Sequence, residues 1–373
     1  MPKHIGILTS GGDCPGLNAA IRGLVRAGEF KDNMKFTGFL DGFRGLAFDH
    51  SLPLHGGNLA GILTDGGTIL GTCRDKPHKI KVDGKKIDMT DAICKTYARH
   101  KLDAVVCIGG GGTQKNALRL LKAGLNVVTL PKTIDNDIAF TDTSIGYDTA
   151  RGIATESIDR LHSTATSHNR VITVEIMGHR AGWLALESGI AGGADVILLP
   201  EIPYDLAKVS ATIQRRTQAG RHFSIVAVAE GAMSTTDAQK ISQLVDAKKN
   251  AESKAAKRRA SAQLDKIHAR HVDHTVKLTA ELEKSTGLES RLSILGHLQR
   301  GGTPSSYDRI LATQLGAHCI EILAEGGNGV MVSLQGNELK TVDLSEVAGR
   351  KKFVPANHSL IRAARYAGTC FGD

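Results

Sequence analysis

Three features are missing from this 373-residue sequence, and each absence excludes a class of protein. No apolar stretch reaches the roughly 18 residues of a membrane-spanning helix, because charged residues or glycine interrupt every run, including Ile190 to Ile202. The six cysteines lack the Cys-x-x-Cys or Cys/His spacing of a metal site, and the first residues lack the pattern of a secretory signal. We therefore expect a cytoplasmic protein in a reducing environment, with no membrane partner.

Positive charge is concentrated in one segment. The chain has 47 Lys and Arg against 38 Asp and Glu, a formal net charge of +9. Eight of the basic residues lie between Lys248 and His271, against only two acidic residues there. No DNA- or RNA-binding motif accompanies this segment, and the rest of the chain is only mildly basic, as is typical of proteins that bind anionic small molecules. We expect no nucleic-acid partner.

Short apolar runs alternate with helical patterns along the chain. His4 to Thr9 has the length of a strand and ends in a glycine turn, after which Leu17 to Ala27 carries apolar residues at helical spacing. The same unit recurs from Ala104 to Leu121. Alternating strands and helices predict an α/β fold with parallel sheets, in which ligands bind beyond the carboxyl ends of the strands.

The segment from Ala232 to Thr286 has a different composition. It contains no Gly or Pro and is rich in Ala, Lys, Gln, Glu and Arg. This composition predicts a long surface helix or a pair of helices. A solvated charged face is the favoured interpretation, and a subunit contact or a regulatory role stays open.

Polar sequences follow the predicted strands. Two glycine turns, Ser10 to Asp13 and Gly109 to Thr113, are suited to polyphosphate because backbone N–H groups and a helix N-terminus can approach phosphate oxygens there. Neither is a Walker A or GxGxxG motif, and a simple tight turn is the alternative. In a third turn, Asp135 and Asp137 offer one carboxylate to deprotonate a hydroxyl and another to hold Mg²⁺. The alternative there is an Asx-rich turn that caps a helix.

Four sequence blocks resemble the signatures of one enzyme family. They are Thr9–Asn18, Pro131–Asp137, Met177-Gly178 with Ala181–Trp183, and Gly296–Gly302. They occur in the family's order and cover the chain from the first strand to about Ala324. By these blocks the sequence resembles the 6-phosphofructokinases, and within them the bacterial subgroup that mixes ATP-using and pyrophosphate-using members.

The resemblance implies an α/β fold of two Rossmann-like three-layer domains with the active site in the cleft between them. Residues 1–145, with a return at about 296–325, would bind the phosphoryl donor. Residues 146–295 would bind fructose 6-phosphate and carry a helical insertion at about 234–286, and residues 326–373 would form a C-terminal segment. A homodimer or homotetramer with shared active sites is implied.

The implied reaction is phosphoryl transfer from ATP to the 1-hydroxyl of D-fructose 6-phosphate, with Mg²⁺ as cofactor. Asp135 would be the base, with Thr133 beside it, and Arg74 would contact the transferring phosphate. The implied donor-binding residues are Gly12, Arg74, Asp75, Gly110, Gly111, Gly112, Thr113 and Lys132.

The resemblance also implies a substrate-binding set. Arg170 would reach the substrate across a subunit interface, and Arg291 and His297 would contact the 6-phosphate. A base flanked by Arg and Mg²⁺ is sufficient for this chemistry, because phosphoryl transfer needs mainly positioning and positive charge. The full set is Thr133, Asp135, Arg170, Met177, Gly178, His179, Glu230, Arg291, His297 and Arg300.

The sequence departs from the family pattern at two positions. Gly111 replaces the usual Asp near the metal, so metal binding is expected to depend on Asp137 and Asp13. His179 stands where Arg usually follows the Met-Gly pair, so a protonated His179 or the next residue, Arg180, would supply the charge. These departures leave room for a non-catalytic sugar-phosphate-binding paralogue, and phosphorylation of another sugar phosphate is a further alternative.

Two positions bear on the donor and point in opposite directions. Pyrophosphate-using relatives commonly have Asp at the position of Gly112, where a carboxylate would repel the α-phosphate of ATP. Lys132 corresponds to a Lys in those relatives and to Gly in well-known ATP-using enzymes. An Asp at position 112 would exclude ATP, whereas a Lys at position 132 is compatible with both ATP and pyrophosphate. The absence of that Asp therefore decides more than the presence of Lys132, and we predict ATP as the donor. Pyrophosphate-dependent phosphofructokinase is the alternative.

Overall fold

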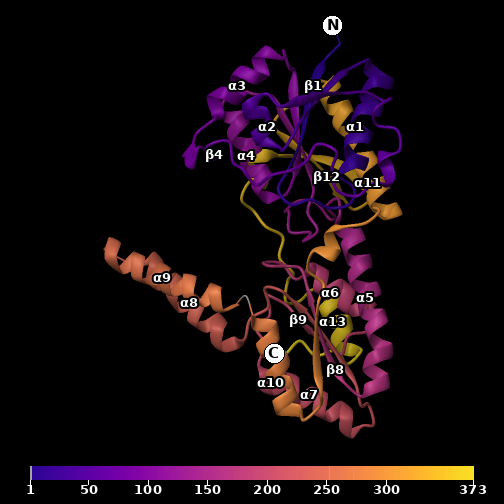
Figure 1. Ribbon diagram of the computed structural model, residues 1–373, viewed down its shortest axis with the longest axis vertical. Coiled ribbons are helices and arrows are strands. Elements are labelled where there is room, and N and C mark those ends of the chain that lie inside the picture. Colours follow the sequence, from indigo (N-terminus) through magenta and orange to yellow (C-terminus); the bar gives the residue numbers. More distant parts are fainter. Residues whose placement is uncertain (1, 252, 272) are drawn as a thin grey trace. The chain divides into compact units, whose positions relative to one another are not determined.

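The chain folds into two units, each described here by itself. The structure is a computed structural model that describes residues 2–251, 253–271 and 273–373; Met1, Glu252 and Val272 of the predicted domains lie outside the described residues. One unit comprises residues up to Ala150 together with Arg300–Lys352, and the other comprises Arg151–Gln299 with Phe353–Asp373. The predicted α/β class is confirmed, since both units are built on mainly parallel sheets covered by helices (Figure 1).

The first unit contains a seven-stranded sheet in the order β13-β12-β7-β6-β1-β2-β3. The five inner strands are parallel, and the two edge strands are antiparallel. The strands are β1 (His4–Ser10), β2 (Lys35–Phe39), β3 (Ser51–Leu54), β6 (Ala104–Gly109), β7 (Val127–Pro131), β12 (Val330–Gln335) and β13 (Glu338–Asp343), and β4 (Ile80–Val82) and β5 (Lys85–Ile87) form a separate hairpin.

Helices cover both faces of this sheet. Alternate strand residues such as Val105 and Cys107 belong to a core with α2, α3 and α4, and the intervening residues point to the opposite face. On that face α1 and α11 lie side by side, and a side chain at Gly23 or Gly316 would collide with the other helix (Figure 1). The helices are α1 (Leu17–Asp32), α2 (Phe43–Phe48), α3 (Thr90–Arg99), α4 (Gly111–Lys122), α11 (Ser306–Ala324), α12 (Leu344–Val347) and the 3₁₀ turn η1 (Ile62–Thr64), and α5 (Tyr147–His168) crosses the boundary between units.

The second unit contains a four-stranded parallel sheet in the order β11-β8-β10-β9. Its strands are β8 (Val171–Ile176), β9 (Val196–Leu198), β10 (Ser224–Ala229) and β11 (Ser290–Ile294). Its helices are α6 (Trp183–Ala191), α7 (Leu206–Gln218), α8 (Thr235–Lys249), α9 (Lys254–His271), α10 (His274–Thr286) and α13 (Ser359–Tyr366), and the 3₁₀ turn η2 (Gly296–Arg300) follows β11. No helix among the described residues is long and apolar enough to cross a membrane.

The first unit's sheet contains a point at which the strand order reverses. In this sheet β1 leads to β2 on one side, whereas β6 leads to β7 on the other, so the carboxyl ends of β1 and β6 flank this point. In the second unit β8 and β10 are the two central strands, and their carboxyl ends lie side by side. Ligands of open α/β sheets bind in the crevices at such points. The glycine turns and the Met177-Gly178 sequence directly follow these strands.

The structure divides the chain differently from the predicted domains. The divisions fall after residues 150, 299 and 352 rather than after 145, 295 and 325. The predicted C-terminal segment 326–373 is shared, because β12 pairs with β7 in the first unit whereas α13 packs on α6 in the second. These are pairings between distant parts of the sequence, which local patterns do not reveal.

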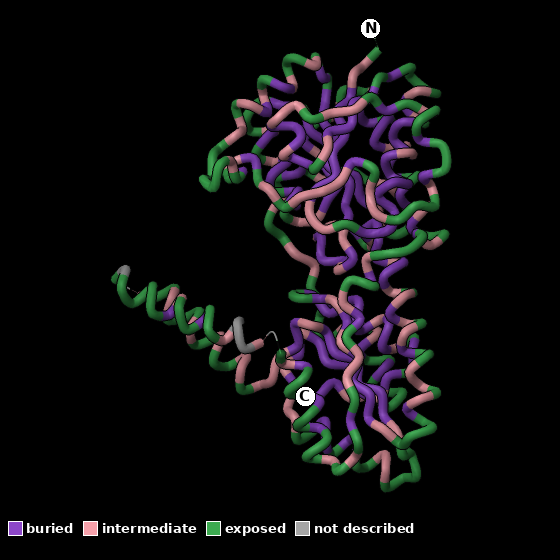
Figure 2. The backbone as a smooth tube through the Cα atoms, in the orientation of Figure 1, coloured by how far each residue is buried: buried purple, intermediate pink, exposed green. Residues whose placement is uncertain are grey.

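The predicted helical insertion at 234–286 contains three helices rather than one or two. Helices α8 and α9 pack on each other, and none of the residues of α8 is buried (Figure 2). Helix α10 differs, because Leu278 and Leu282 are buried where it packs against α7 and β11. Only α8 and α9 therefore form an exposed hairpin, and α10 belongs to the core of the second unit.

Candidate active site

A cavity of about 300 Å³ lies at the reversal point of the first unit's sheet. The loops that follow β1, β6 and β7 form most of its wall. The three predicted catalytic residues line it, as do all the predicted donor-binding residues except Gly111. The lining residues are Ser10, Gly11, Gly12, Asp13, Arg74, Asp75, Lys76, Gly110, Gly112, Thr113, Asn116, Lys132, Thr133, Ile134, Asp135 and Arg300.

The N-terminus of α4 provides one wall suited to phosphate. Gly110, its N-cap residue, is extended, and no acidic residue lies in the first turn of the helix. A Cβ atom at Gly111 or Gly112 would meet no other atom within 4 Å, so the space in front of the helix is open. The first N–H groups of a helix have no partner within it and carry partial positive charge. This wall can therefore hold an anion.

Two hydrogen bonds to Gly11 fasten the Arg74 loop to the turn after β1. The Gly11 N–H donates to the Cys73 carbonyl at 2.9 Å, and the Thr72 hydroxyl donates to the Gly11 carbonyl at 3.0 Å. The neighbouring Asp75 carboxylate is paired with Arg44 at 3.0 Å. This pair offsets the negative charge that Asp75 would otherwise present to a phosphate, while Arg74 lines the cavity.

Two further cations line the same cavity. The Lys132 side chain is buried, and its Nζ donates to the Ser10 carbonyl at 3.3 Å and to the Gly12 carbonyl. Burial lowers the pKa of Lys132 because the ammonium loses its water, and a phosphate bound beside it would favour the charged form again. Arg300, predicted as a sugar contact, donates from Nη1 to the Asp13 carbonyl at 3.1 Å.

Asp135 lies on a turn that is braced from one side. Asn136 adopts the left-handed conformation at φ 51°. Its amide donates to the Asp142 carbonyl at 3.1 Å and accepts from the Ser144 N–H at 3.2 Å. The Asp135 N–H donates to the Thr133 hydroxyl at 3.2 Å. Sequence reasoning missed Asn136 and Ser144, although Asn between two Asp residues is a signal for a left-handed turn position.

The two predicted metal ligands lie in different surroundings. Asp13 lines the cavity, whereas Asp137 does not and its buried carboxylate forms an ion pair with Lys351. Within residues 2–251, 253–271 and 273–373, no group of three or more His, Cys, Asp or Glu side chains is arranged to hold a metal ion. Mg²⁺ that arrives with phosphates needs only one or two carboxylates, because waters and phosphate oxygens supply the other ligands. Of the two predicted ligands, Asp13 is the one that lines this cavity.

The carboxyl ends of β8 and β10 bring together four predicted sugar contacts. The Glu230 N–H donates to the Ile176 carbonyl at 2.8 Å, which places Glu230 beside Met177. Gly178 has φ 137°, and a side chain there would meet the Ala181 carbonyl at 2.8 Å. Across this loop, a side chain on Gly231 would collide with the His179 carbonyl. The close backbone approach explains why glycine occupies both positions.

Gln299 is a residue of this region that sequence reasoning missed. Its side chain is fully buried in η2, and Oε1 accepts from the Met177 N–H at 3.4 Å. It thus fastens the turn that carries His297 to the loop after β8. The two residues are far apart in the sequence, so only a long-range contact reveals this role.

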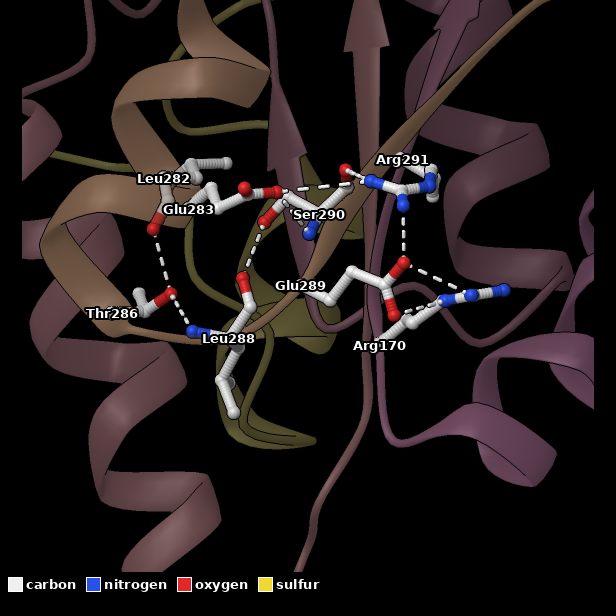
Figure 3. Close-up of polar contacts among 8 residues, drawn as sticks. All are labelled: Arg170, Leu282, Glu283, Thr286, Leu288, Glu289, Ser290 and Arg291. Atoms are coloured by element: carbon white, nitrogen blue, oxygen red, sulfur yellow. Dashed lines mark hydrogen bonds and ion pairs between the residues drawn. The ribbon is translucent and has the colours of Figure 1, made fainter.

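Arg170 and Arg291 lie at the opposite, amino end of the same sheet. Arg170 precedes β8, Arg291 is the second residue of β11, and these strands pair in parallel (Figure 3). His297 follows the carboxyl end of β11. The part of β11 from Arg291 to Ile294 spans about 10 Å, and His297 lies beyond its end. Within one chain Arg291 and His297 therefore extend from different ends of β11.

The comparison with known families agrees with the arrangement of this site. The family model described as phosphofructokinase matches residues 4–323. The chain belongs to the phosphofructokinase family. The ATP-dependent 6-phosphofructokinase of Propionibacterium freudenreichii subsp. shermanii is 55% identical over 373 residues and is matched over 100% of both chains. A pyrophosphate--fructose 6-phosphate 1-phosphotransferase of Amycolatopsis mediterranei is 43% identical, with 94% of this chain and 96% of that chain covered.

A solved phosphofructokinase shares the fold. The crystal structure of the Pichia pastoris phosphofructokinase in the T-state superimposes with a TM-score of 0.76 at 31% identity. The match covers 99% of this chain but only 37% of that much longer chain. The likeness therefore concerns one part of the yeast protein.

Proposed function

We propose that this phosphofructokinase transfers the terminal phosphoryl group of ATP to the 1-hydroxyl of D-fructose 6-phosphate, giving fructose 1,6-bisphosphate in glycolysis. The observation that carries the proposal is the cavity in which Asp135 and the cations Arg74, Lys132 and Arg300 converge beside the N-terminus of α4. The 55% identity to an ATP-dependent 6-phosphofructokinase supports it. Because both substrates occur inside cells, we place the reaction in the cytoplasm.

The cavity supplies a base and stabilising charge. Asp135 accepts the proton of the 1-hydroxyl as its oxygen attacks the terminal phosphorus, and Thr133 beside it helps to orient that hydroxyl. Arg74 and Lys132 stabilise the negative charge on the equatorial oxygens of the transferring group. The glycine turn at the start of α4 holds the donor's remaining phosphates through backbone N–H groups. The leaving group is ADP.

Mg²⁺ fits the same cavity as a partner of the donor. Asp13 would hold it through carboxylate oxygens or through its waters, and when bound it neutralises charge on the donor's phosphates. Gly111 offers no carboxylate, and the Asp137 carboxylate is paired with Lys351. We therefore assign the metal to Asp13 first. Asp137 then acts by holding Lys351 against the turn.

Pyrophosphate is the second candidate donor, because a relative that is 43% identical bears a pyrophosphate-dependent name. Lys132 lines the cavity and could hold the terminal phosphate of either donor. Gly112 favours ATP, because the space in front of it is open and carries no charge that would repel an α-phosphate.

The second half of the site is proposed to be shared between copies of the chain. Arg170 and Arg291 lie at the amino ends of β8 and β11, whereas Met177 and Glu230 lie at carboxyl ends. If the arginines bind the 6-phosphate of a sugar held by the carboxyl-end residues, they must act on the sugar bound by another copy. A homodimer or homotetramer satisfies this requirement.

A coupled assay with fructose 6-phosphate, run separately with MgATP and with pyrophosphate, tests the proposal. We expect kcat/KM for MgATP to exceed that for pyrophosphate. A panel of other sugar phosphates provides the acceptor control. A higher kcat/KM for pyrophosphate would overturn the donor assignment, and no turnover with either donor would favour the non-catalytic paralogue.

A further inference from the structure

One carboxylate joins the two arginines at the amino end of the second unit's sheet. Glu289 accepts from Nε of Arg170 at 2.7 Å and from its Nη2 at 2.9 Å, and it also accepts from Nη2 of Arg291 (Figure 3). The side chains are 24% exposed for Arg170, 40% for Glu289 and 56% for Arg291. This pair of cations, bridged by one anion, faces solvent.

The sheet fixes the backbone beneath this cluster. The Val171 N–H donates to the Glu289 carbonyl at 3.0 Å, and the Ser224 N–H donates to the Arg170 carbonyl at 3.1 Å. The backbone of these residues is therefore held in the sheet, and only the torsion angles of the three side chains remain to be ordered. Each arginine loses rotamer entropy when it is held in one conformation.

Glu289 leaves donors available on both guanidinium groups. Arg170 uses Nε and Nη2 for the carboxylate, and among the described residues its Nη1 has no hydrogen-bond partner. Nη1 of Arg291 donates to the Ser290 carbonyl at 3.1 Å, which leaves Nε available. The hydrogen bonds of Arg170 lower the pKa of Glu289, so the carboxylate is ionised at neutral pH. A second carboxylate, that of Glu283, lies 3.9 Å from Nη1 of Arg291, so the four side chains together carry no net charge. A phosphate would therefore be bound through the remaining N–H donors of the two arginines.

We propose that Glu289 is a positioning residue of the fructose 6-phosphate site, whose carboxylate holds Arg170 and Arg291 in one orientation so that their remaining N–H groups face the sugar's 6-phosphate. The proposal rests on the proposed function and on the assignment of both arginines to that phosphate. Arginines that are already ordered bind an anion without a further loss of side-chain entropy. Neighbouring groups that orient primary ligands have the same effect in other sites.

If Glu289 competed with the phosphate instead of positioning the arginines, removal of its carboxylate would change KM for fructose 6-phosphate in the opposite direction. A carboxylate that merely competed with phosphate for the arginines would weaken substrate binding, so its removal would lower KM for fructose 6-phosphate. A carboxylate that positions them strengthens binding, so its removal raises KM. The 6-phosphate is bound equally in the ground and transition states, so kcat should change little in either case.

Steady-state kinetics of Glu289→Gln and Glu289→Ala distinguish the two roles. We expect KM for fructose 6-phosphate to rise about tenfold in Glu289→Gln and further in Glu289→Ala, with kcat within about twofold of the wild type. Glu156→Gln is the matched control, because Glu156 also binds one arginine, Arg160, through two hydrogen bonds on an exposed helix. The control should leave both constants unchanged.

A double-mutant cycle separates positioning from a general loss of structure. In an Arg170→Ala/Arg291→Ala background, Glu289→Gln should have no further effect on KM, because it acts only through these arginines. Circular dichroism and gel filtration check the fold and the oligomer. An unchanged or lower KM in the single variants of an active enzyme would overturn the proposal, as would a full effect in the double-arginine background. Wild-type enzyme without turnover would instead refute the proposed function.

Discussion

The two sheets of this phosphofructokinase present their predicted functional residues in different ways. In the first unit, the predicted base and most of the donor-binding residues follow the carboxyl ends of β1, β6 and β7 and line one cavity. In the second unit, the predicted residues are divided between the two ends of the sheet. The first arrangement serves a ligand bound by the same chain, and the second requires two ligands or two chains.

The difference shows that the position of a residue before or after a parallel strand indicates at which end of the sheet the residue lies. Residues that follow a parallel strand, such as Lys132 and Glu230, lie at the ligand-binding end of their own sheet. Residues that precede a strand, such as Arg170, lie at the other end. A motif match assigns residues that precede a strand and residues that follow one to the same substrate. The strand direction shows that they lie at opposite ends of the sheet. The following predictions test this separation, from the largest expected effect to the smallest.

Asp135→Asn should lower kcat by about 10³-fold, because it removes the proposed base while keeping the shape of the side chain. Asn136 and Ser144 brace the turn independently of the carboxylate, so the fold should persist. Stopped assays measure turnover, and calorimetric titration with fructose 6-phosphate checks that binding remains. Turnover like that of the wild type would exclude Asp135 as the base.

Arg170→Ala should raise KM for fructose 6-phosphate about 30-fold or more, because a phosphate would lose a charged partner. Its residual activity should be restored in part when the variant is refolded together with Asp135→Asn. Mixed oligomers would contain sites with an intact base from one chain and an intact arginine from another. Each variant refolded alone is the control. A mixture with no more activity than its components would show that one chain supplies both ends of the site.

Gly112→Asp should lower kcat/KM for MgATP about tenfold and affect pyrophosphate much less. The structure accommodates the new side chain, because a Cβ at this position meets nothing within 4 Å. Gly111→Asp is the matched control, since it adds the same charge one residue earlier, where the family usually has a carboxylate. An equal loss with both donors would mean that the charge acts on a phosphate they share.

Replacement of residues 241–265 by a short Gly/Ser linker should change kcat and KM by less than about twofold. This segment covers most of α8 and α9, which pack mainly on each other, so oligomer size or solubility should change instead. A longer deletion to residue 284 should unfold the protein, because it removes the buried Leu278 and Leu282. Loss of activity in the shorter deletion with an unchanged oligomer would show that the hairpin shapes the site.

The sequence predicted the local parts of this molecule well. Strand, glycine turn and helix follow one another at β1 and β6 as expected, because each unit is encoded within about 25 neighbouring residues. The family membership was also predicted from short motifs, and the family match confirms it. Both successes depend on patterns that are continuous along the chain.

The contacts between distant segments were not predictable in the same way. Gln299 hydrogen-bonds to Met177, and Glu289 bridges Arg170, only because parallel pairing brings β11 beside β8. The residues of α10 resemble those of α8 in composition, yet α10 packs into the core because α7 and β11 lie beneath it. Neither contact is encoded within a single segment, so these roles could not be predicted from local sequence patterns.

The division of the chain also has a consequence for its synthesis on the ribosome. The first unit is not complete until β12 pairs with β7, and β12 is translated only after residues 151–299. About 200 residues separate the end of β7 from β12, so at typical rates of about 5–20 residues per second one side of β7 stays unpaired for roughly 10 to 40 s. During that interval the unpaired N–H and C=O groups of β7 can form hydrogen bonds with strands other than β12. While each copy of this protein is being synthesised, the side of β7 that later pairs with β12 therefore has to be protected from other strands.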